Sequence, residues 1–489
     1  MNINIKTISI AVITFALTAF SAGDAFADYY KDGMRNYIRK NYDKAREQLL
    51  KAVEQGDRGN AYYFLGEIER TRSNFADAEK YYELAVNSKS INKGYLKNAY
   101  WNLLALAERM QDYRKVVKIS KGMWFKLRDG GARQKIDSII NKFLWTDNEE
   151  AVEKYRRGMS LKVSGNTEGA LKAFSEASDI DHQFLAPRFE MGMISYKEGK
   201  NDKALYHLGA VADKIEFYAE VQLILGEVQY ARNNYSVAIA HFNNAHEFGM
   251  FDAETEYLIK TKRGTCLFQT GEYAQSMADF TGAMKINKSA IQPYIMIAAI
   301  HTKENEYAKA MNVLEKANKM QPNNPVILFQ MGSIFYKQDD ERYMECFDKT
   351  FDLIRDHENY SEKYNKMVTL LIAEHYKKQD LARVTEIISF VPEDRQSGDI
   401  IRIGALTYFT LKNYEKAIGL FQKVSLGSED KFTLSIAYAR SGRTAKAKEI
   451  LSPLIGDDRY LQKARKDKTL APIVREIEAS LKEKSGVVK

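Results

Sequence analysis

Apolar residues recur at helical spacing along most of the chain, in pairs of stretches that are each about 14 residues long. Turn-forming residues separate the two stretches of a pair, as at Asn41-Tyr42, Gly165-Asn166 and Asn413-Tyr414. This pattern predicts helical hairpins, each with a first and a second helix joined by a short turn.

The hairpins share small and bulky residues at fixed positions, with a period of about 34 residues. The first helix carries a small residue at Gly33, Gly66, Gly158, Gly192, Gly226, Gly264, Ala298, Gly332 and Ala405. Twelve residues later the second helix carries another, at Ala45, Ala78, Ala170, Ala204, Ala238, Ser276, Ala310 and Ala417. Four residues further on, a bulky residue follows at Leu49, Tyr82, Phe174, Leu208, Phe242, Phe280, Leu314 and Phe421. Because one such hairpin cannot bury both of its faces, we expect the hairpins to stack.

This spacing resembles that of the tetratricopeptide repeat family, whose period is about 34 residues. The resemblance covers about residues 28–455 and implies an all-α fold, an α-solenoid of stacked helix-turn-helix hairpins forming a superhelix. The family's first-position Trp is absent from the clear units, and the units around Gly332 and Ala373 are degenerate. The repeat count, between ten and twelve, therefore stays open.

Two stretches break the period and suggest domain boundaries. Residues 121–150, which include Asp129-Gly130-Gly131, are interpreted as an irregular helical insertion or hinge between an N-terminal block (28–120) and a main array (151–455). An irregular hairpin inside one continuous solenoid is the alternative. Residues 456–489 are rich in Lys and Arg and predict a C-terminal capping helix, around Ile473 to Lys482, followed by a basic tail. Membrane and glycan are candidate contacts for that tail.

Residues 1–27 have the organisation of a cleavable signal peptide. Lys6 ends a short basic region, Thr7 to Phe20 are mostly apolar, and Ala25-Phe26-Ala27 has the small-x-small form of a cleavage site. Fourteen residues span only about 21 Å as a helix, less than the ~30 Å hydrocarbon core, so a retained anchor is the weaker alternative. We therefore expect export, a mature chain from about Asp28 and, in a two-membrane bacterium, a periplasmic location.

Charge and cysteine content exclude several classes of protein. The 73 Lys and Arg exceed the 65 Asp and Glu by eight, but both signs are interleaved along the chain, which does not favour nucleic-acid binding. Cys266 and Cys346 are 80 residues apart and fall on different helix types, so we expect two buried thiols rather than a disulfide or a zinc site.

The sequence contains none of the short motifs that usually carry catalysis. H-E-x-x-H, G-x-S-x-G and a phosphate-binding glycine loop are all absent. His207 and His241 occupy equivalent positions 34 residues apart, but no carboxylate or thiolate at helical spacing would complete a metal site, so we interpret them as unrelated surface histidines. We predict no enzyme activity, no cofactor and no metal.

The resemblance implies that the first helices line a concave surface, with groove-facing residues near the second, fifth, ninth, twelfth and thirteenth positions of each unit. The candidate groove residues are Tyr155, Met159, Phe189, Met193, Tyr196, Lys197, Leu223, Glu227, Tyr230, Phe268, Phe329 and Tyr336. Aromatic and Met side chains of this kind are typical of protein-binding surfaces, although some could instead only fill space between neighbouring first helices. No unit has the ninth-position Asn of the family's carboxylate clamp, so an extended apolar segment or an amphipathic helix fits the groove better.

Two functions follow from these features. The first is a non-catalytic periplasmic scaffold that binds other envelope proteins in a bacterial assembly, with a flagellar motor, secretion and outer-membrane machinery as candidate settings. The second is a carbohydrate-associated module in polysaccharide export or cell-wall remodelling, in which some of the 30 Tyr residues would hold sugars. Neither function requires an integral membrane span after removal of the signal peptide.

Overall fold

The computed structural model describes residues 29–56, 59–355 and 361–484. All regular elements in these ranges are helices, which confirms the predicted all-α fold. Among the described residues, no helix combines the length and the apolar character needed to cross a membrane. The predicted signal peptide, residues 1–27, lies outside the described ranges.

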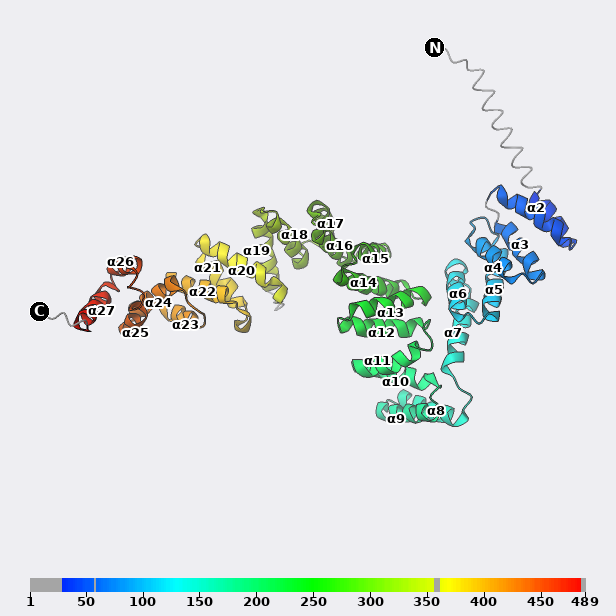
Figure 1. Cartoon of the computed structure of the whole chain (residues 1–489), viewed down its shortest axis with the longest axis horizontal. Coiled ribbons are helices and arrows are strands. Elements are labelled where there is room, and N and C mark those ends of the chain that lie inside the picture. Colours follow the sequence, from blue (N-terminus) through cyan, green and yellow to red (C-terminus); the bar gives the residue numbers. More distant parts are fainter. Residues whose placement is uncertain (1–28, 57–58, 356–360, 485–489) are drawn as a thin grey trace, which may run out of the picture. The chain divides into compact units, whose positions relative to one another are not determined.

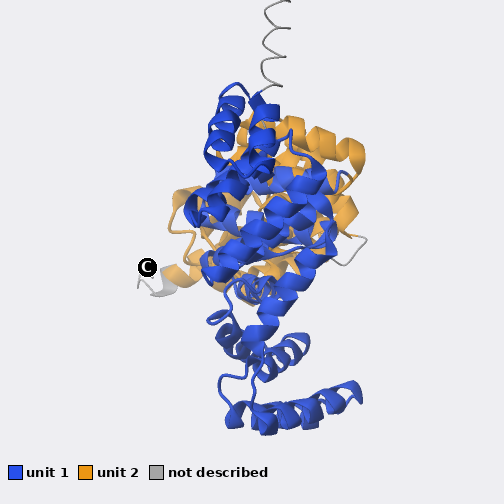
Figure 2. Cartoon of the chain, turned by 90° about the vertical axis from the view of Figure 1, so that its right-hand side faces the viewer, with its two compact units in different colours: residues 1–288 blue, residues 289–489 orange. Residues whose placement is uncertain are grey.

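The chain divides into two compact units, residues 1–288 and 289–489 (Figure 2). Unit 1 begins with helical residues 29–38 and continues with α2 (Tyr42–Glu54), α3 (Gly59–Thr71), α4 (Phe75–Asn87), α5 (Lys93–Arg109), α6 (Tyr113–Leu127), α7 (Gly130–Leu144), α8 (Glu149–Val163), α9 (Thr167–Ile180), α10 (Leu185–Lys197), α11 (Asn201–Ala212), α12 (Ala219–Ala231), α13 (Tyr235–Phe248), α14 (Ala253–Thr270) and α15 (Tyr273–Ile286). Unit 2 contains α16 (Gln292–Lys303), α17 (Tyr307–Met320), α18 (Pro325–Lys337), α19 (Arg342–Arg355), η1 (Glu362–Tyr364), α20 (Asn365–Lys377), α21 (Leu381–Phe390), η2 (Glu393–Arg395), α22 (Gly398–Thr410), α23 (Tyr414–Phe421), α24 (Ser428–Arg440), α25 (Thr444–Leu451), α26 (Asp458–Lys466) and α27 (Ala471–Lys484).

Within each unit, consecutive helices pair as hairpins, and each hairpin packs on the next (Figure 1). In unit 1 the helices α8 to α15 form four such hairpins in chain order. In unit 2 the helices α16 to α25 form five. The units are therefore built as an α-solenoid of stacked helix-turn-helix hairpins, as the period predicted.

The small and bulky residues of the period make the contacts that close each hairpin. A Cβ atom added to Gly158 would lie 2.6 Å from the Phe174 ring, and one added to Gly226 would lie 2.8 Å from the Phe242 ring. All eight predicted small residues of the second helices, and all eight predicted bulky residues, have an exposed fraction of 0%. Glycine is thus required on the first helix because the aromatic ring occupies the space of a side chain.

The turns also follow the sequence. In the hairpin α8–α9, Gly165 adopts a positive φ of 82°, and Asn166 is the N-cap of the second helix. The Asn166 side chain accepts a hydrogen bond from the backbone N–H of Gly169, which satisfies one of the free donors at the helix start.

Two units of the array depart from the predicted register. In α18–α19, the residue that faces Gly332 is Phe347, which follows it by 15 residues rather than 16. In α20–α21, the fully buried first-helix residue is Ile372 and not Ala373, which is half-buried. The branched side chain of Ile372 therefore occupies the position that glycine or alanine holds in the regular units.

Residues 121–150 contain the second half of α6, all of α7 and the start of α8. The helix predicted to run to Trp145 is present as α7, which ends at Leu144. Within unit 1, α6 packs against α13 and α7 packs against α10. Whether this stretch acts as a hinge stays a prediction. Near the C-terminus, α27 contains the helix predicted around Ile473, and α26 precedes it.

Candidate functional site

The twelve predicted groove residues lie on first helices of their hairpins. Ten of them are in unit 1, on α8, α10, α12 and α14, and the other two are on α18 in unit 2. Eleven are half-buried and Lys197 is exposed. Each unit is therefore considered by itself.

Three neighbouring first helices of unit 1 are joined by a polar chain. The Tyr196 hydroxyl of α10 donates a hydrogen bond to the Glu227 carboxylate of α12, and the Lys262 ammonium of α14 pairs with the other oxygen of that carboxylate. Burial, and then the bond to Glu227, raises the pKa of Tyr196 to about 12. The Lys262 ammonium also lies 5.9 Å from the ring centroid of Tyr230. These contacts hold α10, α12 and α14 together, so Glu227 is already paired within the chain.

Tyr155 extends the core rather than standing free. Its ring lies 5.6 Å from Trp145, 5.2 Å from Phe184 and 5.6 Å from Phe174, measured between ring centroids. Burial raises its pKa to about 12. Met159, one turn further along α8, packs with Tyr155 beside the same small cluster of buried residues.

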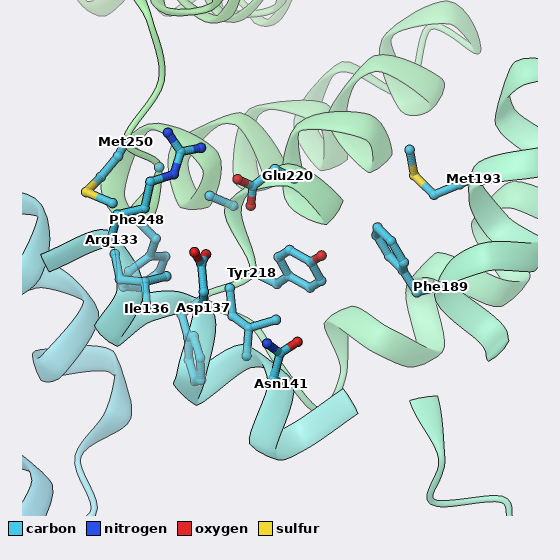
Figure 3. A pocket seen from close by; sticks show the side chains of 14 residues that line it. Arg133, Ile136, Asp137, Asn141, Phe189, Met193, Tyr218, Glu220, Phe248 and Met250 are labelled. Atoms are coloured by element: carbon cyan, nitrogen blue, oxygen red, sulfur yellow. The ribbon is translucent and has the colours of Figure 1, made fainter. Parts of the chain in front are cut away.

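Phe189 and Met193 line a cavity of about 470 Å³ in unit 1 (Figure 3). One wall comes from α7, and the other comes from α10, the start of α12 and the residues that follow α13. The Phe189 ring stacks on Tyr218 with a centroid separation of 5.4 Å and an interplanar angle of 23°. Burial raises the pKa of Tyr218. We call this space the α7 cavity.

The polar residues of the α7 cavity were not among the predicted residues. Arg133, Asp137 and Asn141 lie on α7, and Glu220 lies in the first turn of α12; all four are exposed. Glu220 occupies the second position of its unit, six residues before Gly226, so the positional rule for the groove points to it. The α7 residues carried no such signal, because α7 is outside the period and meets α10 only in the folded chain.

The N-terminal part of unit 1 is held against the hairpin α12–α13 by basic residues of α6. Arg114 pairs with Glu216 at 3.1 Å, and Lys118 pairs with Glu247. The Lys121 ammonium donates hydrogen bonds to the backbone carbonyls of the residues before Phe248, and burial lowers its pKa. These contacts fix the position of α6, and of α7 that follows it, as one wall of the cavity.

The remaining predicted residues pack mainly on neighbours of their own hairpins. Ring centroids lie 6.3 Å apart for Tyr230 and Tyr235, and 5.7 Å apart for Phe268 and Tyr273. Leu223 packs beside the buried cluster around Phe242. In unit 2 the corresponding contacts are Phe329 with Phe347 and Tyr364, at 6.1 and 5.1 Å, and Tyr336 with Tyr343, at 5.2 Å.

His207 and His241 are half-buried, which corrects their interpretation as surface residues. Burial lowers the pKa of both imidazoles, and His241 is hydrogen-bonded through Nδ1 to Gln222 at 2.7 Å. In the described part of the chain, one group of potential metal ligands lies together, with atoms within 4.8 Å: His301, Glu304 and Glu306. Glu306 already pairs there with His301 and with Lys309, each at 2.7 Å.

The two cysteines are both free thiols. Cys266 is buried, as predicted, and burial raises its pKa to about 12, which disfavours the reactive thiolate. Cys346 is only half-buried, which corrects the prediction that both would be buried.

Comparison with known families identifies the repeat. Residues 39–95 and residues 291–324 each match a family model described as a tetratricopeptide repeat. The chain contains tetratricopeptide repeats. The first matched segment includes α2, α3 and α4 of unit 1, and the second contains α16 and α17 of unit 2.

Similar proteins share low sequence identity with the chain. A BBSome complex member BBS4 homolog of Drosophila melanogaster is 24% identical over 161 residues, which cover 30% of this chain and 32% of that protein. DnaJ homolog subfamily C member 3 of Homo sapiens is 22% identical over 189 residues, which cover 36% of this chain and 37% of that protein. The chain thus spans about a third of the length of these relatives. A solved tetratricopeptide repeat protein from Parabacteroides merdae has a TM-score of 0.34 at 13% identity, over 59% of this chain and 99% of that one.

Proposed function

We propose that this tetratricopeptide repeat protein is a non-catalytic scaffold that binds a segment of another protein along the first helices of unit 1. The observation that carries the proposal is the α7 cavity, where the half-buried Phe189 and Met193 border a space of about 470 Å³. A cavity of this size, with apolar walls and a few polar groups at its edge, is typical of binding sites. Elsewhere in the groove, Glu227 and Tyr155 are already engaged within the chain, which concentrates the free contact surface at the cavity.

The setting that we propose for this scaffold is the periplasm of a two-membrane bacterium, in an envelope assembly. The organisation of residues 1–27 as a signal peptide supports it. Mass spectrometry of the protein purified from its source cells tests this point directly. We expect a mature N-terminus at about Asp28, and an intact N-terminus in a cytoplasmic fraction would contradict the proposed export.

Photocrosslinking in the source cells tests the binding surface. A benzoylphenylalanine residue at Met193 or Lys197 of α10 should form a covalent adduct with a partner protein. The matched control is Tyr206 on α11, a second-helix residue that is 66% exposed, which should form no adduct with that partner. Adducts formed only at Tyr206, or none at either α10 position, would contradict the groove as the binding surface.

The α7 wall also favours a second candidate, binding of carbohydrate. Arg133, Asp137 and Asn141 are the kinds of side chain that bind sugar hydroxyl groups, and they lie beside the aromatic pair of Phe189 and Tyr218. However, these two rings stack on each other, which leaves only one face of each for a sugar. Retention of the protein on peptidoglycan or polysaccharide that is lost with Asn141→Ala would favour this candidate.

A further inference from the structure

The α7 cavity combines an apolar interior with a rim that carries more negative than positive charge. Ile136, Phe217 and Phe248 are buried in its walls, and Met193 is half-buried. The charged groups at the rim are Arg133, Asp137 and Glu220, whose side chains extend toward the same part of the cavity in Figure 3. Two carboxylates thus face one guanidinium.

The two carboxylates are available to a ligand. In the described part of the chain, neither Asp137 nor Glu220 makes a side-chain hydrogen bond or an ion pair within 4 Å. Glu220 is open to the water in the cavity, but the surrounding walls displace bulk solvent, and this burial raises its pKa. The Asp137 carboxylate raises that pKa further, whereas Arg133 lowers it. Both carboxylates would gain from a second cation, because like charges in a partly desolvated site repel each other.

The apolar surface continues from the cavity along α10. Phe189 and Met193, one turn apart, belong both to the cavity wall and to the groove surface. A ligand that places a cation between Asp137 and Glu220 can therefore lay apolar groups against α10 at the same time. A polypeptide segment with a basic side chain next to apolar ones has this chemistry, and its charge is complementary to the rim.

We propose that the α7 cavity binds a partner segment in which a lysine or arginine, flanked by apolar side chains, is held between Asp137 and Glu220. This inference rests on the proposed function, since it names the chemistry of the partner in that groove. A sugar or an acidic segment would instead use Arg133 and Asn141, so those ligands are alternative outcomes of the test.

The test is selection of a phage-displayed random dodecapeptide library on the folded full-length chain. Selected peptides are then synthesised with a fluorescent label, and their dissociation constants are measured by anisotropy. We expect enrichment of Lys or Arg beside apolar residues, and affinity at least about tenfold weaker for the double variant Asp137→Asn, Glu220→Gln, which is a change of about 1.4 kcal/mol. The matched control is Glu153→Gln, Asp179→Asn, which removes two exposed carboxylates from α8 and α9 and should leave affinity unchanged.

One further variant gives the sign of the preference. Arg133→Gln removes the competing guanidinium, so it should strengthen binding of the basic peptides by several-fold, whereas it would weaken binding of acidic ones. Circular dichroism confirms that each variant is folded before its affinity is measured.

The outcomes separate this inference from the proposed function. If no peptide is selected, both the groove proposal and the cationic preference fail. If peptides are selected and lose affinity with Phe189→Ala but not with the Asp137, Glu220 double variant, the groove binds a segment and the inference is overturned. Enrichment of acidic peptides, with weaker binding by Arg133→Gln, would overturn it as well.

Discussion

The hairpin α12–α13 of unit 1 and the hairpin α20–α21 of unit 2 close their helix pairs with different residues. In α12–α13, Gly226 lies against the ring of Phe242, and Ala238 is fully buried. The absence of side-chain bulk on two of the three positions lets the helices approach closely around one ring. The buried contact is almost entirely apolar, so it depends on shape.

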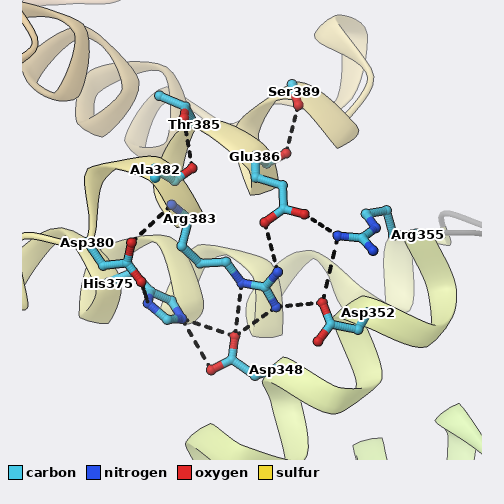
Figure 4. Close-up of polar contacts among 10 residues, drawn as sticks. All are labelled: Asp348, Asp352, Arg355, His375, Asp380, Ala382, Arg383, Thr385, Glu386 and Ser389. Carbon is cyan, nitrogen blue, oxygen red and sulfur yellow. Dashed lines mark hydrogen bonds and ion pairs between the residues drawn. The ribbon is translucent and has the colours of Figure 1, made fainter.

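In α20–α21 the corresponding positions hold Ile372, Val384 and Ile388, with exposed fractions of 0%, 0% and 5%. Branched side chains on both helices prevent the close backbone approach that Gly and Ala allow. The residues one position later, Thr385 and Ser389, use their hydroxyls on backbone carbonyls of α21 itself, at 2.8 and 2.7 Å (Figure 4). They contribute no hydrogen bond to the neighbouring helix.

Polar contacts supply much of the attachment of α21 to its neighbours. The Arg383 guanidinium, only 16% exposed, donates to Asp352 at 2.8 Å, to Glu386 at 2.9 Å and to Asp348 at 3.2 Å (Figure 4). His375 of α20 lies 3.0 Å from the same Asp348 carboxylate. The comparison therefore teaches that a repeat unit can lose its small residues where charged side chains hold adjacent helices.

The largest expected effect breaks the apolar side of this comparison. Phe242→Ala should lower the free energy of opening of α12–α13 by about 3–5 kcal/mol, because it removes a fully buried ring and leaves a cavity against Gly226. Ile388→Ala should lower that of α20–α21 by about 2–4 kcal/mol. Hydrogen exchange with mass spectrometry on the full chain measures both, since a protein of two units need not unfold in one step.

Val237→Ala is the control for that experiment, because Val237 lies on the same helix α13 but is 46% exposed. Its effect should stay within about 0.5 kcal/mol. Equal exchange in the Phe242 and Val237 variants would show that the ring does not hold the hairpin together.

The second effect breaks the polar side. Arg383→Gln should lower the opening free energy of α19–α21 by about 1–3 kcal/mol, because it leaves three carboxylates facing one another without their cation. Lys349→Gln on α19 removes a lysine that is 57% exposed and pairs with Glu345, so it should cost only about 0.3–0.5 kcal/mol. Hydrogen exchange of the same peptides compares the two, and an equal effect would contradict a structural role for the Arg383 contacts.

Most of the fold could be predicted from the sequence because the packing rule is local and repeated. Gly226, Ala238 and Phe242 must recur at fixed spacing wherever two helices meet around one ring. In α20–α21 the rule failed by one residue, because Ala373 has the expected small size while the neighbouring Ile372 makes the buried contact. Once the packing uses branched residues, composition no longer marks the register.

The candidate site was only partly predictable for a related reason. Phe189 and Met193 follow from the period, and Glu220 lies at a position that the same rule covers. Asp137 does not, because α7 has no counterpart in other units and contacts α10 across about 50 residues of intervening chain. Long-range contacts of a non-repeating helix leave no periodic signal.

The third effect sharpens the role of glycine in the regular hairpin. Gly226→Ala should destabilise α12–α13 by about 1 kcal/mol, because the new Cβ lies 2.8 Å from the Phe242 ring and outweighs the gain in helix propensity. Gly209→Ala on α11 should instead stabilise by about 0.5–1 kcal/mol, since a Cβ there meets nothing within 4 Å. Opposite signs in hydrogen exchange are expected, and stabilisation by both substitutions would contradict the close packing at Gly226.

The smallest effect sharpens the polar side through pH. The hydrogen bond from Arg383 is the main cause of the lowered pKa of Glu386, with a further contribution from Arg355. A carboxyl whose folded pKa is depressed stabilises the fold above its unfolded pKa of about 4.5, and this contribution is lost as the pH falls through the folded value. The carboxyl is 36% exposed, so the contribution should be at most about 1 kcal/mol.

Comparison of the wild type with Glu386→Gln isolates this term from the other carboxylates. The difference in opening free energy of α19–α21 should be constant from pH 7 to about pH 5 and should shrink toward pH 3. Hydrogen exchange at matched intrinsic rates measures it, with Glu345→Gln on the exposed face of α19 as the control for acid titration outside the Arg383 contacts. A difference that grows as the pH falls would mean that protonated Glu386 is the better partner in the fold, and the charged contacts would then not explain how this unit stays attached without its small residues.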